Sequence, residues 1–281
     1  MKITATINGQ DYQAHLADSK NIAIAVHFDG EQPNHFSVPV ASAHAIEGGG
    51  FVGDTRRGGS CNVDQITMVP HCNGTHTECV GHIIDERLSV NQLLQDNLLA
   101  TRLITVSPTL VSGPTDDYTP ALDNGDKLID KACLVEQLAD INDEELAALV
   151  VRTLPNDAEK QSMSYDELHY PPFFSHDAIR YLNQRGVKHL LVDFPSLDRM
   201  HDEGNLSSHH LFWQVKPLSR TLDELVLSFK TITEMVYIGA DISDGLYLLN
   251  LQIAPFELDA APSRPMLIPL SPSLIPLKTN I

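Results

Sequence analysis

Apolar and polar residues alternate in short stretches near both ends of the chain. In residues 2–8 and 21–28 this alternation has the period of two that is typical of a strand with one buried face. Ile22, Ile24 and Val26 share one face of the second stretch. Three further strands are predicted at residues 230–238, 247–254 and 266–270. The chain is therefore expected to begin and end in β-structure.

The middle of the chain predicts two parallel strands joined by a helix. Residues 146–152 and 187–193 are apolar runs with the length of a buried strand. Between them, a helix is predicted at residues 175–185, with Ser175 as its N-cap and Gly186 at its end. A strand, a helix and a second strand in this order favour a crossover between parallel strands.

Shorter patterns predict the remaining elements. These are a strand at residues 63–70, a helix at 89–95 capped by Ser89, a strand at 98–106 and a helix at 126–139 within an acidic, irregular segment from 108 to 145. The glycine-rich residues 48–59 are interpreted as a loop that either approaches another group closely or is mobile. We expect a single mixed α/β domain over residues 1–281, rich in strands and with few helices, including an N-terminal β extension at about residues 1–45.

Composition narrows the classes of function. The 281 residues are 42% hydrophobic, and 37 acidic against 19 basic residues give a formal net charge of −18. Such a surface repels phosphate backbones and anionic lipids, so neither a nucleic acid nor a membrane is expected as a partner. The chain start lacks the apolar core of a signal peptide, and no run reaches the roughly 20 apolar residues of a membrane span. We therefore expect a cytoplasmic protein with reduced cysteines and a small-molecule substrate.

The densest group of reactive side chains lies between Cys72 and His82. Cys72, His76, Glu78 and His82 are side chains that ligate transition metals or transfer protons. His76 and Glu78 are two residues apart, so in an extended segment both can reach one ion. Cys72 would complete the ligand set as a thiolate. The alternative interpretation is a polar turn whose imidazoles face water.

Two positions of this segment have more than one interpretation. His71 is a more usual ligand type than its neighbour Cys72, and it would replace Cys72 at the metal if the turn carried an extra residue. We favour Cys72 because of its spacing from His76. His82 is interpreted either as a general acid and base near neutral pH or as a structural histidine that bonds a backbone carbonyl.

Three further candidates lie far away in the sequence. Asp193 follows the predicted strand at residues 187–193, and His209 lies downstream of it. Ligands tend to bind outside the carboxyl ends of such strands, which favours both residues as site residues. Glu234 is an acid within an apolar strand. If it points inward it needs a partner such as a metal, and if it points outward it belongs to a solvated face.

These residues together resemble the metal-dependent cyclase-type hydrolases, whose best-known members are the bacterial kynurenine formamidases (arylformamidases) of tryptophan catabolism. The family pattern is a histidine, three residues, a histidine, one residue, an aspartate, three residues and a histidine. Four residues of this chain have the same spacing: Cys72, His76, Glu78 and His82. Similar segments lie at residues 53–55, 61–67, 152–153, 186–198, 208–210 and 258–264.

The resemblance implies a swivelling β/β/α fold, a homodimer or homotetramer, and one or two zinc ions, with manganese as the alternative metal. It implies that Cys72 and His76 hold the first metal. Glu78 and Glu234 would bridge both metals, and His209 would hold the second. The proton shuttle would be His82. An aromatic residue beside the substrate is implied at Phe51.

Two departures from the family pattern bear on the function. Cys72 replaces a histidine and Glu78 an aspartate, and a thiolate favours zinc over manganese. The expected function is hydrolysis of a carbon–nitrogen amide bond, as in N-formylkynurenine, by metal-activated water. The alternatives are the opening of a cyclic amide or lactone, and a non-catalytic metal- or ligand-binding protein of the same fold.

Overall fold

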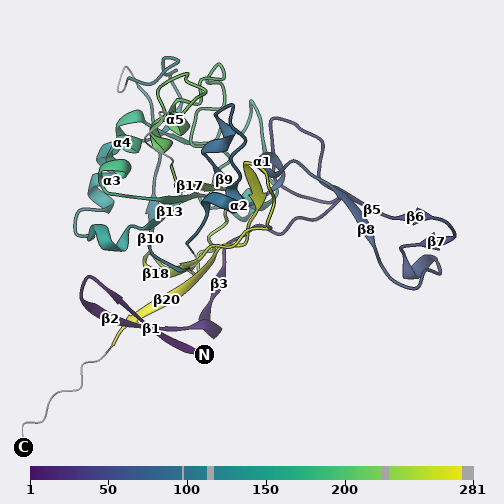
Figure 1. Cartoon of the computed structure of the whole chain (residues 1–281). Coiled ribbons are helices and arrows are strands. Elements are labelled where there is room, and N and C mark those ends of the chain that lie inside the picture. The colour runs from purple at the N-terminus through teal and green to yellow at the C-terminus, as the bar shows by residue number, and fades with distance from the viewer. Residues whose placement is uncertain (97, 113–116, 223–227, 274–281) are drawn as a thin grey trace, which may run out of the picture.

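The computed structural model describes residues 1–96, 98–112, 117–222 and 228–273. Its main element is an eleven-stranded sheet (Figure 1). Ten of its strands lie side by side along one path, and the eleventh, β3 (Lys20–Asn21), pairs with β20 (Met266–Pro272). In sheet order this path is β1 (Lys2–Ile7), β2 (Gln10–His15), β20 (Met266–Pro272), β18 (Gly245–Asn250), β10 (Leu98–Val106), β13 (Ala148–Thr153), β16 (His189–Val192), β17 (Thr231–Glu234), β9 (His76–Cys79) and β19 (Ala260–Pro262). The predicted strand-rich mixed α/β domain is confirmed.

The centre of the sheet is parallel and buried on both faces. β10, β13, β16 and β17 run in the same direction, and β18 and β9 flank them in the opposite direction. Leu149 and Val151 of β13 pack into the core that the longer helices cover, whereas Ala148 and Val150 pack on the other face with Ile22. The helices are α1 (Pro70–Asn73), α2 (Val90–Leu93), α3 (Lys131–Gln137), α4 (His176–Gln184) and α5 (Ser207–Trp213).

The crossover predicted in the middle of the chain is confirmed. β13 and β16 are parallel, and α4 lies between them in the sequence. The hydroxyl of Ser175 accepts a hydrogen bond from the backbone N–H of Ala178, so Ser175 is the N-cap that its residue type predicts. Gly186 follows α4 with a φ of +77°, a left-handed conformation that favours glycine.

Two predicted elements are wrong in part. Residues 21–28 form a strand only at Asn21 and an isolated bridge at Ala23. The backbone N–H of Ile24 donates to the hydroxyl of Thr75 instead of to a neighbouring strand. The helix predicted at residues 126–139 is shorter, because β12 (Lys127–Ile129) takes its first residues and Asp130 caps α3.

An arm of four short strands extends from the body of the protein (Figure 1). β5 (Ser42–Ala45) pairs with β8 (Asp64–Thr67), and β6 (Glu47–Gly48) pairs with β7 (Phe51–Val52) at the far end. The glycine-rich segment predicted as a loop therefore holds a hairpin. We call residues 42–67 the arm.

Two segments of the chain are only partly described. Residues 113–116 of the acidic segment 108–145 lie outside the described residues, as do residues 223–227 between His209 and Glu234. In the described parts of the acidic segment, β11 (Thr109–Leu110) pairs with β12.

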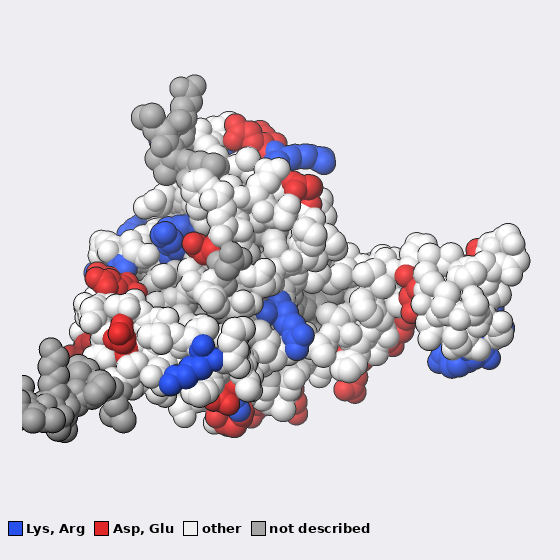
Figure 2. Space-filling view, turned by 60° about the horizontal axis from the view of Figure 1, so that its bottom comes forward, with Lys and Arg blue, Asp and Glu red and all other residues white. Residues whose placement is uncertain are grey.

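Charge is dispersed on the face shown in Figure 2. Basic side chains lie there singly or in small groups between acidic ones. Within the described part of the chain, every helix is too short or too polar to cross a membrane.

Candidate metal centre

Two antiparallel strands carry three of the predicted metal ligands. β9 pairs with β17 so that His76 lies opposite Glu234 and Glu78 lies opposite Ile232. All residues of both strands are buried. Because side chains two residues apart on a strand share a face, His76 and Glu78 point to the same side of the sheet. Two buried carboxylates therefore lie beside a buried imidazole and need compensating charge.

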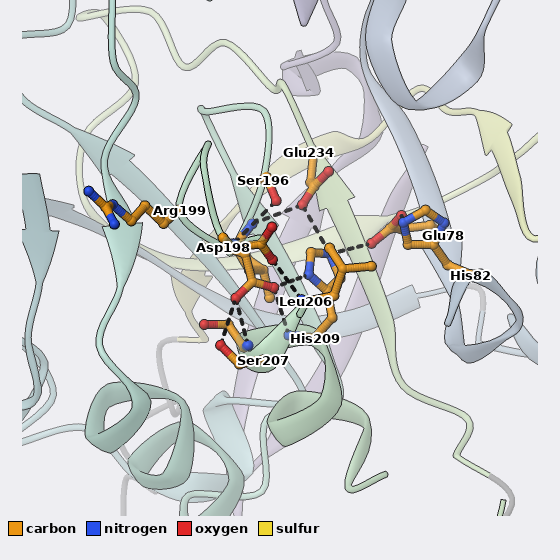
Figure 3. A network of polar contacts seen from close by, with 12 residues as sticks. Glu78, His82, Ser196, Asp198, Arg199, Leu206, Ser207, His209 and Glu234 are labelled. Carbon is orange, nitrogen blue, oxygen red and sulfur yellow. Dashed lines mark hydrogen bonds and ion pairs between the residues drawn. The ribbon is translucent and has the colours of Figure 1, made fainter. Parts of the chain in front are cut away.

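Glu78 contacts two imidazoles with its two carboxylate oxygens. Its Oε1 is 3.0 Å from Nε2 of His209 (Figure 3), and its Oε2 is 3.0 Å from Nδ1 of His71. Nε2 of His209 also lies 3.6 Å from Oε1 of Glu234. Nε2 of His76 lies 3.4 Å from Oε2 of Glu234. The fold thus brings His209 to Glu78 across a sequence separation of 131 residues.

The structure places His71, and not Cys72, against the other donors. His71, His76 and Glu78 each offer one possible ligand atom, and these three atoms lie within 4.8 Å of one another. Among the described residues, Cys72 belongs to no group of side chains that lie this close together. Cys72 lines the same cavity as a thiol, and burial raises its pKa to about 11. The physical reason is α1, because a helical turn over Pro70–Asn73 replaces the extended approach that the spacing suggested. The geometry therefore supports His71 over the favoured Cys72.

The donor atoms fit a transition-metal ion. Nδ1 of His76 lies 3.0 Å from the carbonyl oxygen of Gly74, so it carries the proton and leaves the lone pair on Nε2. This Nε2 is buried and has no hydrogen-bond partner in the described part of the chain, a costly state that an ion would relieve. Imidazole and carboxylate ligands suit zinc and also manganese.

The acids of this group require positive charge. Burial raises the pKa of Glu78, but the neighbouring imidazoles of His82 and His209 outweigh it and hold this pKa well below its ordinary range. Burial lowers the pKa of His209, whereas the carboxylates of Asp198 and Glu234 raise it well above the ordinary value. Without an ion, protons on the imidazoles supply the charge. A metal cation would replace them, so we expect metal binding to release protons.

Asp198 orients His209 from the side opposite Glu78 (Figure 3). Its Oδ2 lies 2.6 Å from Nδ1 of His209, and its carboxylate accepts hydrogen bonds from the N–H of Ser208 and the hydroxyl of Tyr118. Burial raises the pKa of Asp198, but the hydrogen bond from His209 outweighs it, and the pKa falls to about 2. Nδ1 of His209 therefore donates to Asp198, and its Nε2 faces Glu78.

Replacing Asp198 with asparagine is expected to weaken the binding of a metal ion about 10- to 100-fold, as the loss of a carboxylate behind a ligating imidazole does. A zinc titration against a competing chelator measures this loss. Asp193→Asn is the matched control, because Asp193 is also buried but pairs with Lys160 at 2.8 Å. Equal losses in both variants would contradict a specific role of Asp198.

His82 lies at the edge of the group, where it reaches both the cavity and solvent. η3 (Val80–His82) follows β9, and the side chain of His82 is 27% exposed. Its Nδ1 lies 3.2 Å from Oδ2 of Asp259, and its Nε2 lies 4.0 Å from Oε2 of Glu78. Its ring stacks on His71 with 4.2 Å between the centroids. A carboxylate, not a backbone carbonyl, therefore holds His82 at Nδ1, and its Nε2 is directed toward Glu78 at the edge of the cavity.

Three residues of the site were missed by sequence reasoning. Asp259 binds both His71 and His82, and these hydrogen bonds lower its pKa below the ordinary range. Asp198 and Asp259 both lie in segments that resemble the cyclase-type hydrolases, which was the available signal. His35 lines the same cavity of about 220 Å³, but it lies in the two-residue strand β4 (Asn34–His35), which is too short to show a pattern in the sequence.

His35 predicts a pH dependence of stability. Both of its ring nitrogens are buried without hydrogen-bond partners in the described structure, and burial lowers its pKa to about 4 from 6.5. The unfolded chain therefore binds a proton that the folded chain does not, so stability falls as the pH falls from 6.5 to 4. His35→Phe is expected to lower by about one the number of protons that the chain takes up on unfolding in this pH range, which flattens the change of stability with pH. Urea unfolding at several pH values measures it, and an unchanged slope would contradict the assignment.

Two candidates lie away from the cavity. Phe51 is 37% exposed on β7 at the far end of the arm, and it does not line the cavity of its own chain. Asp193 follows β16 as predicted, but its carboxylate accepts hydrogen bonds from Thr153 and Lys160. It is therefore a structural acid outside the metal cavity.

Several solved structures share this fold. An isatin hydrolase bound to the product analogue thioisatinate is 15% identical, with a TM-score of 0.59 over 92% of this chain and 94% of that one. A predicted metal-dependent hydrolase from Bacillus stearothermophilus is 17% identical, with a TM-score of 0.55 over 89% and 97% of the two chains. Isatin hydrolase A from Labrenzia aggregata is 14% identical, with a TM-score of 0.56 over 89% and 93%.

The sequence itself also has a family match. No curated protein matches the chain. The sequence profile of the family Cyclase, described as "Putative cyclase", matches residues 4–199, which is more than half of the chain. The protein therefore belongs to the cyclase family.

Proposed function

We propose that the protein is a metal-dependent hydrolase that cleaves a carbon–nitrogen amide bond and uses zinc. The observation that carries this proposal is that Glu78 belongs to two groups of possible ligands, one with His71 and His76 and one with His209 and Glu234. Two adjacent ligand groups with a shared carboxylate suit one or two ions. The fold shared with an isatin hydrolase and a predicted metal-dependent hydrolase supports it.

The side chains have distinct roles in this proposal. When bound, a metal ion would act as a Lewis acid and lower the pKa of water, so that hydroxide would be available as a nucleophile near neutral pH. His76 and His209 are each fixed by a hydrogen bond at Nδ1, so their Nε2 atoms face the carboxylates. His82 is held at Nδ1 by Asp259, which leaves its Nε2 to pass a proton to the leaving nitrogen.

Two classes of amide fit these roles. The resemblance to kynurenine formamidases favours a linear N-formyl aromatic amine, and the isatin hydrolases among the similar structures favour a cyclic amide. Both reactions begin with attack on a carbonyl carbon. A hollow of about 450 Å³ adjoins the cavity and shares His82 and Leu206 with it, so there is room for an aromatic group beyond the reacting carbonyl.

An assay panel tests this function. The protein is loaded with zinc or with manganese and given N-formylkynurenine, isatin and a set of lactones. We expect hydrolysis of at least one amide, its loss after treatment with a chelator, and its recovery when zinc is restored. Hydrolysis that survives removal of the metal, or a zinc-loaded protein that cleaves none of these compounds, would contradict the proposal.

We also propose that two copies of the chain associate through the arm. Ile46, Phe51, Val63 and Ile66 of the arm are between 37% and 52% exposed, and a second copy would cover these apolar side chains. A partner's arm would also bring Phe51 toward a substrate. Light scattering is expected to give twice the chain mass, and Ile66→Ser with Phe51→Ser is expected to give a monomer. A wild-type monomer would contradict this association.

A further inference from the structure

A second group of reactive side chains lies at the start of α5, outside the metal cavity. Oγ of Ser207 is 2.8 Å from Nε2 of His176, and Nδ1 of His176 is 3.2 Å from Oδ1 of Asp117. All three residues line a cavity of about 260 Å³. This cavity shares no lining residue with the metal cavity.

We propose that Asp117, His176 and Ser207 form a second hydrolytic site, which needs no metal and takes small neutral esters. A hydroxyl, an imidazole and a carboxylate linked in this order form the arrangement of serine hydrolases, which is recognised by geometry and not by sequence position. The site uses none of the possible metal ligands, so its reaction can be tested without metal, although Asn205 and Leu218 also line the hollow beside the metal cavity.

The protonation states follow from the contacts. Arg180 donates to both carboxylate oxygens of Asp117, at 3.0 and 2.7 Å, which favours the ionised acid. An ionised Asp117 only accepts, so Nδ1 of His176 carries the proton and Nε2 has the lone pair. His176 is 6% exposed, which fixes its ring. The imidazole is thereby in the tautomer that can take a proton from Ser207.

The hydroxyl of Ser207 lies 2.8 Å from Nε2 of His176. The carbonyl oxygen of Thr119 and Oδ1 of Asp198 are farther away, both at 3.4 Å, and the hydroxyl of Tyr118 is a further neighbour. Nε2 of His176, the nearer atom, therefore accepts the hydrogen bond that the hydroxyl of Ser207 donates.

The walls of the cavity indicate the substrate class. Leu211, Pro217 and Leu218 give it an apolar side that suits a short acyl chain. Asn205 lines it too, and its side chain makes no hydrogen bond to other described residues. Its amide is therefore available to a carbonyl oxygen that gains negative charge.

The reaction balances without a further reagent. Oγ of Ser207 forms a bond to the ester carbonyl carbon while the hydroxyl proton passes to Nε2 of His176. The C–O bond to the alcohol then breaks, and the departing alcohol takes that proton. Water repeats the same steps on the acyl group, which releases a carboxylic acid and restores Ser207.

The competing interpretation is purely structural. Ser207 contacts Asp198, which holds His209 (Figure 3), so the three residues could serve only to support the metal centre. A structural role requires no reactivity of the hydroxyl. The two interpretations therefore differ in whether Ser207 is a nucleophile in metal-free protein.

The test uses the full chain after dialysis against a chelator. The protein is incubated with a fluorophosphonate probe, the adduct is located by peptide mass spectrometry, and hydrolysis of p-nitrophenyl acetate is followed in parallel. We expect one adduct on Ser207, none in Ser207→Ala, and at least ~100-fold slower labelling in His176→Gln. Ser60→Ala, an exposed serine of the arm, should label as wild type.

Asp117→Asn keeps the test decisive if the buried His176 variant fails to fold, because the Asp117 side chain is 61% exposed. Its labelling is expected to be at least ~10-fold slower, since the imidazole loses the group that fixes its tautomer. No adduct on Ser207 in wild-type protein, or an adduct that forms equally fast in Asp117→Asn, would overturn the proposal.

Discussion

Glu78→Gln is expected to lower zinc affinity by at least ~100-fold and to remove amide hydrolysis with it. Glu78 lies within two groups of possible ligands, with one carboxylate oxygen 3.0 Å from His209 and the other 3.0 Å from His71. Glutamine keeps the size of the side chain but replaces one of these oxygens with an amide nitrogen that does not ligate. It also removes the negative charge. Elemental analysis and a competitive zinc titration measure the effect.

Glu145→Gln is the matched control for this variant. Glu145 is also buried, but it binds Arg102 away from the metal centre. It should keep wild-type zinc content, although the variant loses an ion pair. Normal zinc content and activity in Glu78→Gln would show that the centre of the site is elsewhere.

His82→Ala is expected to lower kcat about 10²- to 10⁴-fold, the range for loss of a general acid or base. The zinc content should stay at the wild-type level, because the contacts of His76 and His209 do not depend on His82. Steady-state kinetics on the best amide of the panel measure the first effect, and elemental analysis measures the second. His15→Ala, an exposed histidine of β2, is the control.

Two outcomes would change the role of His82. A variant with full activity would exclude proton transfer by this residue. A variant that loses zinc would make His82 a ligand, together with His71 and Asp259, which form a further group of possible ligand atoms within 4.8 Å of one another.

The local part of the site was predictable from the sequence because strand geometry is regular. The spacing of His76 and Glu78 places both side chains on one face whatever the surrounding fold. The crossover between β13 and β16 followed from two apolar runs and a capped helix. An acid within an apolar strand made Glu234 a candidate, and the structure buries this side chain beside His76.

The remaining parts of the site depend on tertiary structure. The choice between His71 and Cys72 depends on a single helical turn at Pro70–Asn73, which spacing cannot reveal. Asp259 reaches His71 from the far end of the chain, 188 residues away. Such contacts are set by the pairing of β19 with β9, and no local pattern encodes them.

The central claim is that Glu78 holds a metal together with imidazoles from separate parts of the chain. A crystal structure of the zinc-loaded protein, with anomalous diffraction at the zinc edge, tests this most directly. We predict a zinc peak about 2.0–2.2 Å from an oxygen of Glu78 and from Nε2 of His209 or His76. An active, zinc-loaded protein with no anomalous peak beside Glu78 would contradict the claim.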